Sequence, residues 1–392
     1  MKRLGSTLLL MGAWLGASAG GCTGSVGGGA GGGSATGGSP GSSGGATGTG
    51  GRASGATGGS NSNGTGGRGT GGRGTGGQGT AVTPDGSTTD LTPHAPFVAV
   101  GYGALRAYSA DGKSWTTAPA PTTLPAGWSG SPTVGDNQWN LRGGCNGLGM
   151  FLAVGGTTND DGMMLSSTNG TTWSLVGGQM SNDGCAYGNG RFLTNVRTST
   201  DGKTWTSIST QISSRQMVFG KGMFVSVGDN GGGDVHYSTD GKTWQALPIT
   251  YTGTDANRLG YDALAYGNGR FVAINLMISS SPIFEWDGAS TTSFTETPRA
   301  SLIGSNVAVT ALAYGQGSFV IATANSLYRM ADGATTWQSA SFTGAAKISS
   351  LVITDTLYVS DTSWSADGVT FKDATNAPGG GGLVNLIIPT LQ

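Results

Sequence analysis

Two short phrases alternate from Phe97 to the end of the chain and repeat about every 40 residues. The first is an apolar stretch, a glycine turn and a second apolar stretch, as in LAYGNGRFVAIN from Leu264. The second surrounds an Asp-Gly or Asn-Gly pair, as in YSTDGKTWQ from Tyr237. Repeats of this length are typical of propellers and solenoids, in which each unit buries its apolar face only against its neighbours. The sequence therefore predicts an array of small all-β units.

Each repeat predicts four antiparallel strands. Asp-Gly and Asn-Gly between alternating stretches are the strongest short-range hairpin signals, because they supply the positive φ of a type I′ turn. Small residues such as Ala263 and Ala265 suit an inner strand at the crowded axis of a radial array. A bulky aromatic residue marks the outer strand, where we expect it to fill the widening space between blades. These aromatic residues are Trp115, Trp173, Trp205, Trp244, Phe294, Trp337 and Phe371.

Counting these aromatic residues predicts a seven-bladed, all-β propeller of four-stranded antiparallel blades. The first repeat has only three strands of its own, beginning at Phe97. Residues 383–388 form an apolar segment beyond the glycines at 379–382, and they predict the missing inner strand. Such a closed ring has no free edges near its axis. A six-bladed ring is the alternative, because the fifth repeat, IFEWDGASTTSF from Ile283, is irregular.

The first 21 residues read as a secretory signal peptide. Lys2 and Arg3 precede an apolar stretch and then small residues. Ala19-Gly20-Gly21-Cys22 resembles a bacterial lipobox, which implies lipidation of Cys22, whereas Ala17-Ser18-Ala19 is an ordinary cleavage site. We therefore expect a lipoprotein of the cell envelope, in the outer membrane or at the cell surface, with a secreted protein as the alternative.

Residues 22–94 consist mainly of Gly, Ser, Thr and Ala, so they cannot bury enough apolar surface to fold. We expect a disordered tether there and the propeller in residues 95–392. The formal net charge is −1, with 20 basic and 21 acidic residues, which argues against nucleic acid as a partner.

Cofactor sites have little support in the sequence. The two histidines, His94 and His236, predict no metal cluster, and no phosphate-binding loop is found. We expect no cofactor, although the Asp-rich loops at 159–162 and 229–234 contain oxygen ligands of the kind that Ca²⁺ uses. Cys145 and Cys185 fall on inner strands of consecutive repeats, where either a disulfide or two small buried side chains would fit.

The SxDGKTW phrase resembles the Asp-box, or BNR repeat, of sialidase-like propellers, whose usual form is S-x-D-x-G-x-x-W. Most copies here are one residue shorter than that form. In that family the box is a structural turn far from the active centre. The resemblance implies a turn-bracing role, through hydrogen bonds to backbone amides, for Asp111, Asn169, Asp201, Asp240, Asp332 and Asp367.

Sialidase activity does not follow from this resemblance. Such enzymes bind a carboxylate with three arginines and use a tyrosine activated by a glutamate as the nucleophile. They also carry an Arg-Ile-Pro phrase that is absent here. The sequence has two glutamates, Glu285 and Glu296, both in the fifth repeat. Arg191 and Arg270 belong to the repeated Gly-Arg-Phe turn and so look structural. We assign no catalytic residue and consider an enzyme the less favoured reading.

The long insertions between strands all fall on one face of the predicted ring. Exposed aromatic side chains beside convergent polar groups are typical of a binding surface. The candidate ligand-binding residues are Trp128, Asp136, Trp139, Arg142, Tyr251, Asp255, Asn257 and Arg258.

Three functions remain after this reading. The favoured one is a monomeric, surface-displayed binding or scaffold module for a glycan or a protein. The alternatives are a divergent sialidase-like glycoside hydrolase and an assembly factor similar to the photosystem II stability factor, whose propeller uses related repeats.

Overall fold

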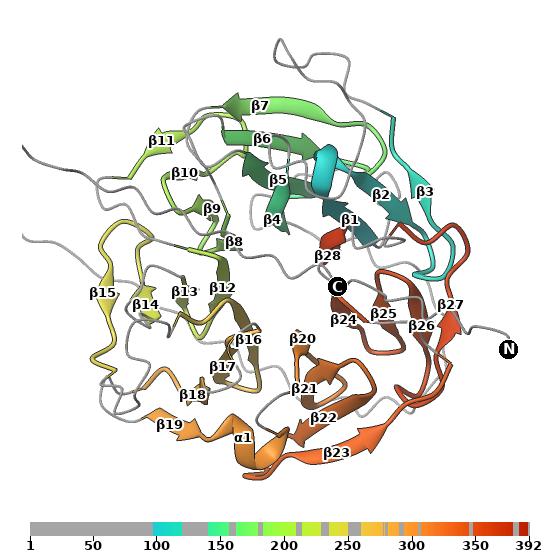
Figure 1. Ribbon diagram of the computed structural model, residues 1–392. Coiled ribbons are helices and arrows are strands. Elements are labelled where there is room, and N and C mark those ends of the chain that lie inside the picture. The colour runs from blue at the N-terminus through green and yellow to red at the C-terminus, as the bar shows by residue number, and fades with distance from the viewer. Residues whose placement is uncertain are drawn as a thin grey trace, which may run out of the picture. The chain divides into compact units, whose positions relative to one another are not determined.

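The computed structural model describes residues 97–119, 140–156, 162–178, 183–208, 214–228, 235–249, 260–276, 278, 281–289, 294–304, 307–344, 348–378 and 384–390. These residues form a seven-bladed β-propeller of four-stranded antiparallel sheets, as predicted (Figure 1). Blade one has the strand order β28-β1-β2-β3, and blades two to seven use β4 to β27 in chain order. Within each blade we call the strands inner, second, third and outer.

The inner strands surround the axis of the ring (Figure 1). They are β28 (Val384–Pro389), β4 (Leu141–Gly147), β8 (Cys185–Gly188), β12 (Gln216–Gly220), β16 (Ala263–Gly267), β20 (Val309–Gly315) and β24 (Leu351–Ile353). The second strands carry most of the buried aliphatic residues. They are β1 (Phe97–Gly101), β5 (Met150–Gly156), β9 (Arg191–Thr194), β13 (Met223–Val227), β17 (Arg270–Ile274), β21 (Ser318–Thr323) and β25 (Tyr358–Ser360).

The third strands lead into the Asp-Gly and Asn-Gly hairpins. They are β2 (Arg106–Ser109), β6 (Gly162–Ser167), β10 (Arg197–Ser199), β14 (Val235–Ser238), β18 (Ile283–Trp286), β22 (Ser326–Ala331) and β26 (Ser363–Ser365). The outer strands are mostly short, which limits the unpaired edge that each blade presents. They are β3 (Thr116–Thr117), β7 (Ser174–Gly178), β11 (Thr206–Ser207), β15 (Gln245–Ala246), β19 (Phe294–Thr297), β23 (Gln338–Ser341) and β27 (Lys372–Asp373). Two short helices, η1 (Tyr102–Ala104) and α1 (Arg299–Leu302), complete the described elements.

The C-terminal strand closes the ring, as the sequence predicts. Strand β28 pairs antiparallel with β1, and Ala99 lies opposite Ile387 in the register. The chain therefore supplies the inner strand of blade one from its end and the other three strands from the start of the repeat region. The irregular fifth repeat also forms a complete blade, β16 to β19, which excludes the six-bladed alternative.

The hydrophobic core is divided among the junctions between blades. Among the described residues, seven clusters of buried side chains each join two adjacent blades. Trp173, for example, is 3% exposed and packs with Val98 and Val100 of blade one. Of the outer-strand aromatic residues, Trp115, Trp173, Trp337 and Phe371 are buried, and Trp205, Trp244 and Phe294 are partly buried. Packing between neighbours therefore stabilises the ring, as expected for a repeat protein.

The hairpins between third and outer strands share one hydrogen-bonding pattern in blades one, two, three, four and seven. In blade three, Asp201 Oδ1 accepts the backbone N–H groups of Lys203 at 2.8 Å and Thr204 at 2.7 Å. Ser199 Oγ donates to the same carboxylate and accepts the N–H of Gly202 at 2.8 Å. The same bonds to a side-chain oxygen recur at Asp111, Asn169, Asp240 and Asp367.

Blade six departs from this pattern because Met330 occupies the position of the serine. Asp332 there accepts a hydrogen bond from the Tyr314 hydroxyl at 2.8 Å. Burial, together with this bond and the Asp332 charge, raises the pKa of Tyr314 to about 12. The aspartate of blade six thus ties its hairpin to its own inner strand.

Candidate functional site

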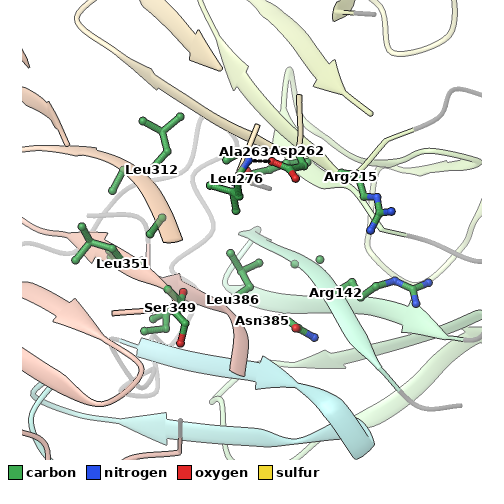
Figure 2. A pocket seen from close by; sticks show the side chains of 18 of the residues that line it. Arg142, Arg215, Asp262, Ala263, Leu276, Leu312, Ser349, Leu351, Asn385 and Leu386 are labelled. Atoms are coloured by element: carbon green, nitrogen blue, oxygen red, sulfur yellow. Dashed lines mark hydrogen bonds between the residues drawn. The ribbon is translucent and has the colours of Figure 1, made fainter. Parts of the chain in front are cut away.

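A cavity of about 320 Å³ lies on the axis of the ring, and all seven inner strands contribute to its lining (Figure 2). Its wall is polar and apolar in about equal parts, and the apolar part includes the side chains of Met217, Leu276, Leu312, Leu351 and Leu386. Figure 2 shows Leu276 and Leu386 pointing toward one another across the middle of the cavity. This size lies at the lower end of the range of small-molecule sites, which is about 300–1,000 Å³.

Polar side chains gather where the inner strands begin. These residues, which we call the rim, are Arg142, Asp183, Arg215, Gln216, Asp262, Thr310, Ser349 and Asn385. Because each blade is an antiparallel meander, this end also carries the connections from the second to the third strands. The hairpin turns lie at the opposite end. The rim is therefore on the face to which the sequence assigned the long insertions.

One side of the rim carries charged side chains of both signs. Arg142 of blade two donates from Nε to Asp183 Oδ1 of blade three at 2.5 Å, and both side chains are about one-fifth exposed. Arg215 of blade four is exposed. Figure 2 places Arg142 and Arg215 on the same side of the cavity, with Leu312 and Leu351 on the other.

The Leu276 side chain is held in the cavity by a buried network in blade five. Asp262 Oδ1 accepts the backbone N–H of Leu276 at 2.6 Å (Figure 2). Arg299 is 1% exposed and donates to the carbonyl oxygens of Asn275 at 2.6 Å and Ile278 at 2.9 Å. Burial lowers the pKa of Arg299, and the charge of Asp262 opposes that shift. Both backbone segments that flank Leu276 are thus fixed before a ligand arrives.

Blades seven and one are fixed in a similar way. Asp361, which is 1% exposed, accepts the backbone N–H groups of Ser349 at 2.9 Å and Ser350 at 3.2 Å, and the Ser349 hydroxyl at 2.5 Å. The Asn385 NH₂ group donates to Asn140 Oδ1 and to the carbonyl oxygen of Leu141. Such bonds pre-organise a site and lower the entropy cost of binding.

A disulfide joins Cys145 of blade two to Cys185 of blade three, with 5.5 Å between the Cα atoms. Cys185 also lines the cavity. The bond links the two blades that carry Arg142 and Asp183.

Of the candidate ligand-binding residues from the sequence, the structure describes Arg142 and places it at the rim. Cys22 and the other candidates lie outside the described residues. These candidates are Trp128, Asp136, Trp139, Tyr251, Asp255, Asn257 and Arg258. Sequence reasoning missed Asp183, Arg215 and Asp262. One signal could have found them. When the repeats are aligned, each of these residues falls within two residues of the start of an inner-strand phrase, at a position that is polar in several repeats.

Both glutamates make contacts within blade five. Glu285 accepts from Arg270 Nη1 at 3.1 Å, and Glu296 accepts from the Tyr261 hydroxyl at 3.3 Å. Neither is among the residues that line the axial cavity. No helix in the described part of the chain has the length and apolar character needed to cross a bilayer.

Comparison with known proteins shows a likeness of fold. No protein-family model matches the sequence, and no curated protein matches it. YCF48, solved bound to a D1 peptide, is 20% identical over 63% of this chain and 82% of its own, with a TM-score of 0.45.

Two bacterial propellers are also similar. The extracellular domain of the two-component system BT4673 from B. thetaiotaomicron is 13% identical over 66% of this chain and 35% of its own, with a TM-score of 0.43. PorZ, a surface component of the type-IX secretion system of Porphyromonas gingivalis, is 13% identical over 66% of this chain and 43% of its own, with a TM-score of 0.44. At these identities the likeness is that of the β-propeller fold.

Proposed function

We propose that the chain is an exported binding module, anchored through a lipid on Cys22 and displayed on a tether of residues 22–94. Its ligand is a glycan or a protein that contacts the rim and the long loops on the same face. The observation that carries this proposal is the axial cavity, in which apolar side chains lie beside pre-organised polar groups. A concave apolar site with a few convergent polar groups is the usual form of a binding site.

The enzyme alternative has less support from the residues around the cavity. The acidic groups at or beside the rim are Asp183, Asp262 and Asp361, and each accepts hydrogen bonds from the protein itself. A glycoside hydrolase needs two carboxyl groups that face the scissile bond from opposite sides. The likeness to YCF48 is one of fold and assigns no peptide to this chain.

The test compares variants on the two faces of the ring. The full chain would be screened against glycans and envelope proteins, and the affinity of each hit would be measured for Arg215→Glu and for Lys203→Glu. Lys203 is an exposed lysine on a hairpin turn, at the end of the blades opposite the rim. Both variants should unfold within about 0.5 kcal/mol of the parent, because each changes an exposed side chain.

Arg215→Glu should lower the affinity about tenfold or more, whereas Lys203→Glu should leave it unchanged. Trp128→Ala, Trp139→Ala and Tyr251→Ala should also weaken binding. A ligand that binds Arg215→Glu and Lys203→Glu equally well would contradict binding at the face that carries the rim. Turnover of a glycoside by the pure protein would contradict the proposal that the chain is a binding module.

The anchor is tested separately. Cys22→Ala should move the protein from the membrane fraction to the soluble fraction. A soluble wild-type protein with Gly20 at its N-terminus would establish the ordinary cleavage site instead.

A further inference from the structure

Asn268 and Gly269 form the exposed turn between the inner and second strands of blade five. The β16–β17 ladder ends at the pair of Gly267 with Arg270, so the backbone N–H of Gly269 lies outside the ladder. Gly269 has φ +74°, and a Cβ atom there would meet nothing within 4 Å. No hydrogen bond within the described part of the chain holds the Asn268 side chain or the N–H of Gly269. Both groups can therefore move without breaking a contact.

An asparagine followed by glycine can lose its side-chain amide without an enzyme. The glycine nitrogen attacks the side-chain carbonyl carbon, a C–N bond forms, and the amide nitrogen leaves as ammonia, which takes up the proton of the former N–H. The cyclic imide that results then adds water at one of its two carbonyl carbons. The products are aspartate and isoaspartate, in which the side-chain carbon has entered the main chain. Glycine favours this attack because it has no Cβ atom to hinder the approach.

Asn189-Gly190 occupies the same turn in blade three, but its side chain is held in place. Its backbone is nearly the same, since Asn189 has φ 48° and Asn268 has φ 44°. The Asn189 amide donates to the carbonyl oxygens of Gly222 at 3.3 Å and Thr239 at 3.2 Å, both in blade four. The amide must leave both acceptors before its carbonyl carbon can turn toward the Gly190 nitrogen.

Two further Asn-Gly pairs in the described residues are also restrained. Asn169 Oδ1 accepts two backbone N–H groups of its hairpin, and the N–H of Gly170 donates to Ser167 Oγ at 2.8 Å. Asn146 lies within strand β4 and donates to the carbonyl oxygen of Pro389. In each pair at least one of the two reacting groups is held by a hydrogen bond.

We propose that Asn268 is a site of spontaneous deamidation, and that its isoaspartate product weakens the junction between blades five and six. The turn begins at Gly267, which receives the ring of Tyr314 from blade six so closely that a Cβ atom would overlap the ring. Isoaspartate adds a main-chain carbon directly after Gly267, and a two-residue hairpin turn cannot absorb it without moving the strand ends. Aspartate adds only a charge at an exposed position, so it leaves the junction intact.

The experiment incubates the folded full chain in mildly alkaline buffer and follows each Asn-Gly pair by peptide mapping and mass spectrometry. Electron-transfer fragmentation distinguishes isoaspartate from aspartate. A parallel sample in urea, with the disulfide reduced, gives the reaction rates of the unfolded chain. Asn189 is an internal control, because residues 186–192 and 265–271 have the same sequence, AYGNGRF.

In urea Asn189 and Asn268 should react at the same rate, since their neighbours are identical. In the folded chain Asn268 should react about tenfold faster than Asn189, because two hydrogen bonds restrain the Asn189 side chain. Asn268→Gln should abolish the reaction at this position. Glutamine fits the turn, since Gln316 occupies the same position in blade six with φ 48°.

The melting temperature tests the effect on the junction. It should fall in the incubated parent as isoaspartate accumulates at Asn268, whereas Asn268→Gln and fresh Asn268→Asp should keep theirs. Equal rates at Asn189 and Asn268 in the folded chain would overturn the site, as would a folded chain that gives no product at Asn268 while the unfolded chain reacts. Isoaspartate at Asn268 without a lower melting temperature would overturn its effect on the junction.

Discussion

The ring of Tyr266 lies flat against the backbone of Gly220 in the preceding blade, so that a Cβ atom on Gly220 would overlap the ring. Tyr266 also contacts Phe271 of its own blade, with 4.7 Å between ring centroids. The same arrangement recurs between other neighbours. Tyr187 lies on Gly147, Phe219 on Gly188 and Tyr314 on Gly267. The Tyr-Gly pair of the repeated phrase is therefore a joint between blades, in which the glycine of one repeat receives the aromatic residue of the next.

Gly220→Ala should destabilise the propeller by about 1–3 kcal/mol, the usual cost of inserting a methyl group into a packed core. The cost should shrink in a Tyr266→Ala background, because the two positions contact each other and their effects should not add. Gly222→Ala is the matched control, since Gly222 has φ +75° and open space around it. Its cost comes from the backbone alone and should be the same in both backgrounds. Urea denaturation of the four variants and their parents measures both differences.

Leu148 occupies a strained position that asparagine fills in other blades. It is 51% exposed and has φ 50° in the turn after the inner strand, where Asn189 and Asn268 have φ 48° and 44°. The left-handed region costs an ordinary residue about 1–2 kcal/mol, and asparagine tolerates it. Leu148→Asn should therefore raise the free energy of unfolding by about 0.5–1 kcal/mol. The reverse change, Asn268→Leu, should lower the free energy of unfolding by a similar amount. If Leu148→Asn does not raise it, the backbone of Leu148 is not strained.

The aspartates of the hairpin turns predict a loss of stability in acid. Hydrogen bonds from the backbone N–H groups of Thr370 and Val369 lower the pKa of Asp367 to about 2. An unfolded aspartate has a pKa near 3.9, so the stabilisation is complete above about pH 4 and is lost as the pH falls toward 2. The pKa values of Asp111, Asp201 and Asp240 are lowered in the same direction and for the same reason.

Asp367→Asn should keep the turn and flatten the dependence of stability on pH between about 4 and 2. Asn169 already makes the same bonds without charge, to Thr171 at 2.9 Å and Thr172 at 2.8 Å. Replacing Asp111, Asp201, Asp240 and Asp367 together should enlarge the effect. Denaturant titrations at several pH values measure the slope of the free energy of unfolding against pH. Equal slopes for the parent and the fourfold variant would show that these turns do not cause the loss of stability in acid.

The sequence was sufficient for the architecture because the architecture is periodic. Each copy of the two phrases indicates the same hairpins, and the unmatched segment at 383–388 predicts ring closure without knowledge of any contact. The irregular fifth repeat still indicates a blade, because Phe294 occupies the outer strand in place of tryptophan.

The rim could not be predicted in the same way. Its residues differ from blade to blade, so the repeated phrases that predict the fold do not predict the site. The partners are also distant in sequence, as in the bond between Arg142 and Asp183, which are 41 residues apart. The packing of blade two against blade three brings this pair together, and the sequence does not show which side chains meet across such a junction.

The last strand contributes to two junctions at once. Ile387 is 2% exposed and packs in the cluster that joins blades seven and one, whereas Ile388 is 4% exposed and packs between blades one and two. The backbone of β28 pairs with β1 over its length. Without β28 both junctions lose buried side chains, and β1 becomes an unpaired edge next to the axis.

Deleting residues 383–392 should therefore unfold the propeller or leave it aggregation-prone at neutral pH. Burial of an aliphatic side chain contributes about 1.5–3 kcal/mol, so losing Val384, Ile387 and Ile388 removes an amount comparable with the total stability of a domain, about 5–15 kcal/mol. A synthetic peptide of residues 383–392 added to the truncated chain should restore the melting transition, because it can pair with β1 as β28 does. The same peptide with Ile387→Asp and Ile388→Asp should fail, since it keeps the backbone pairing but places charges in both junctions. A truncated chain that melts like the parent without any peptide would contradict closure by the C-terminal strand.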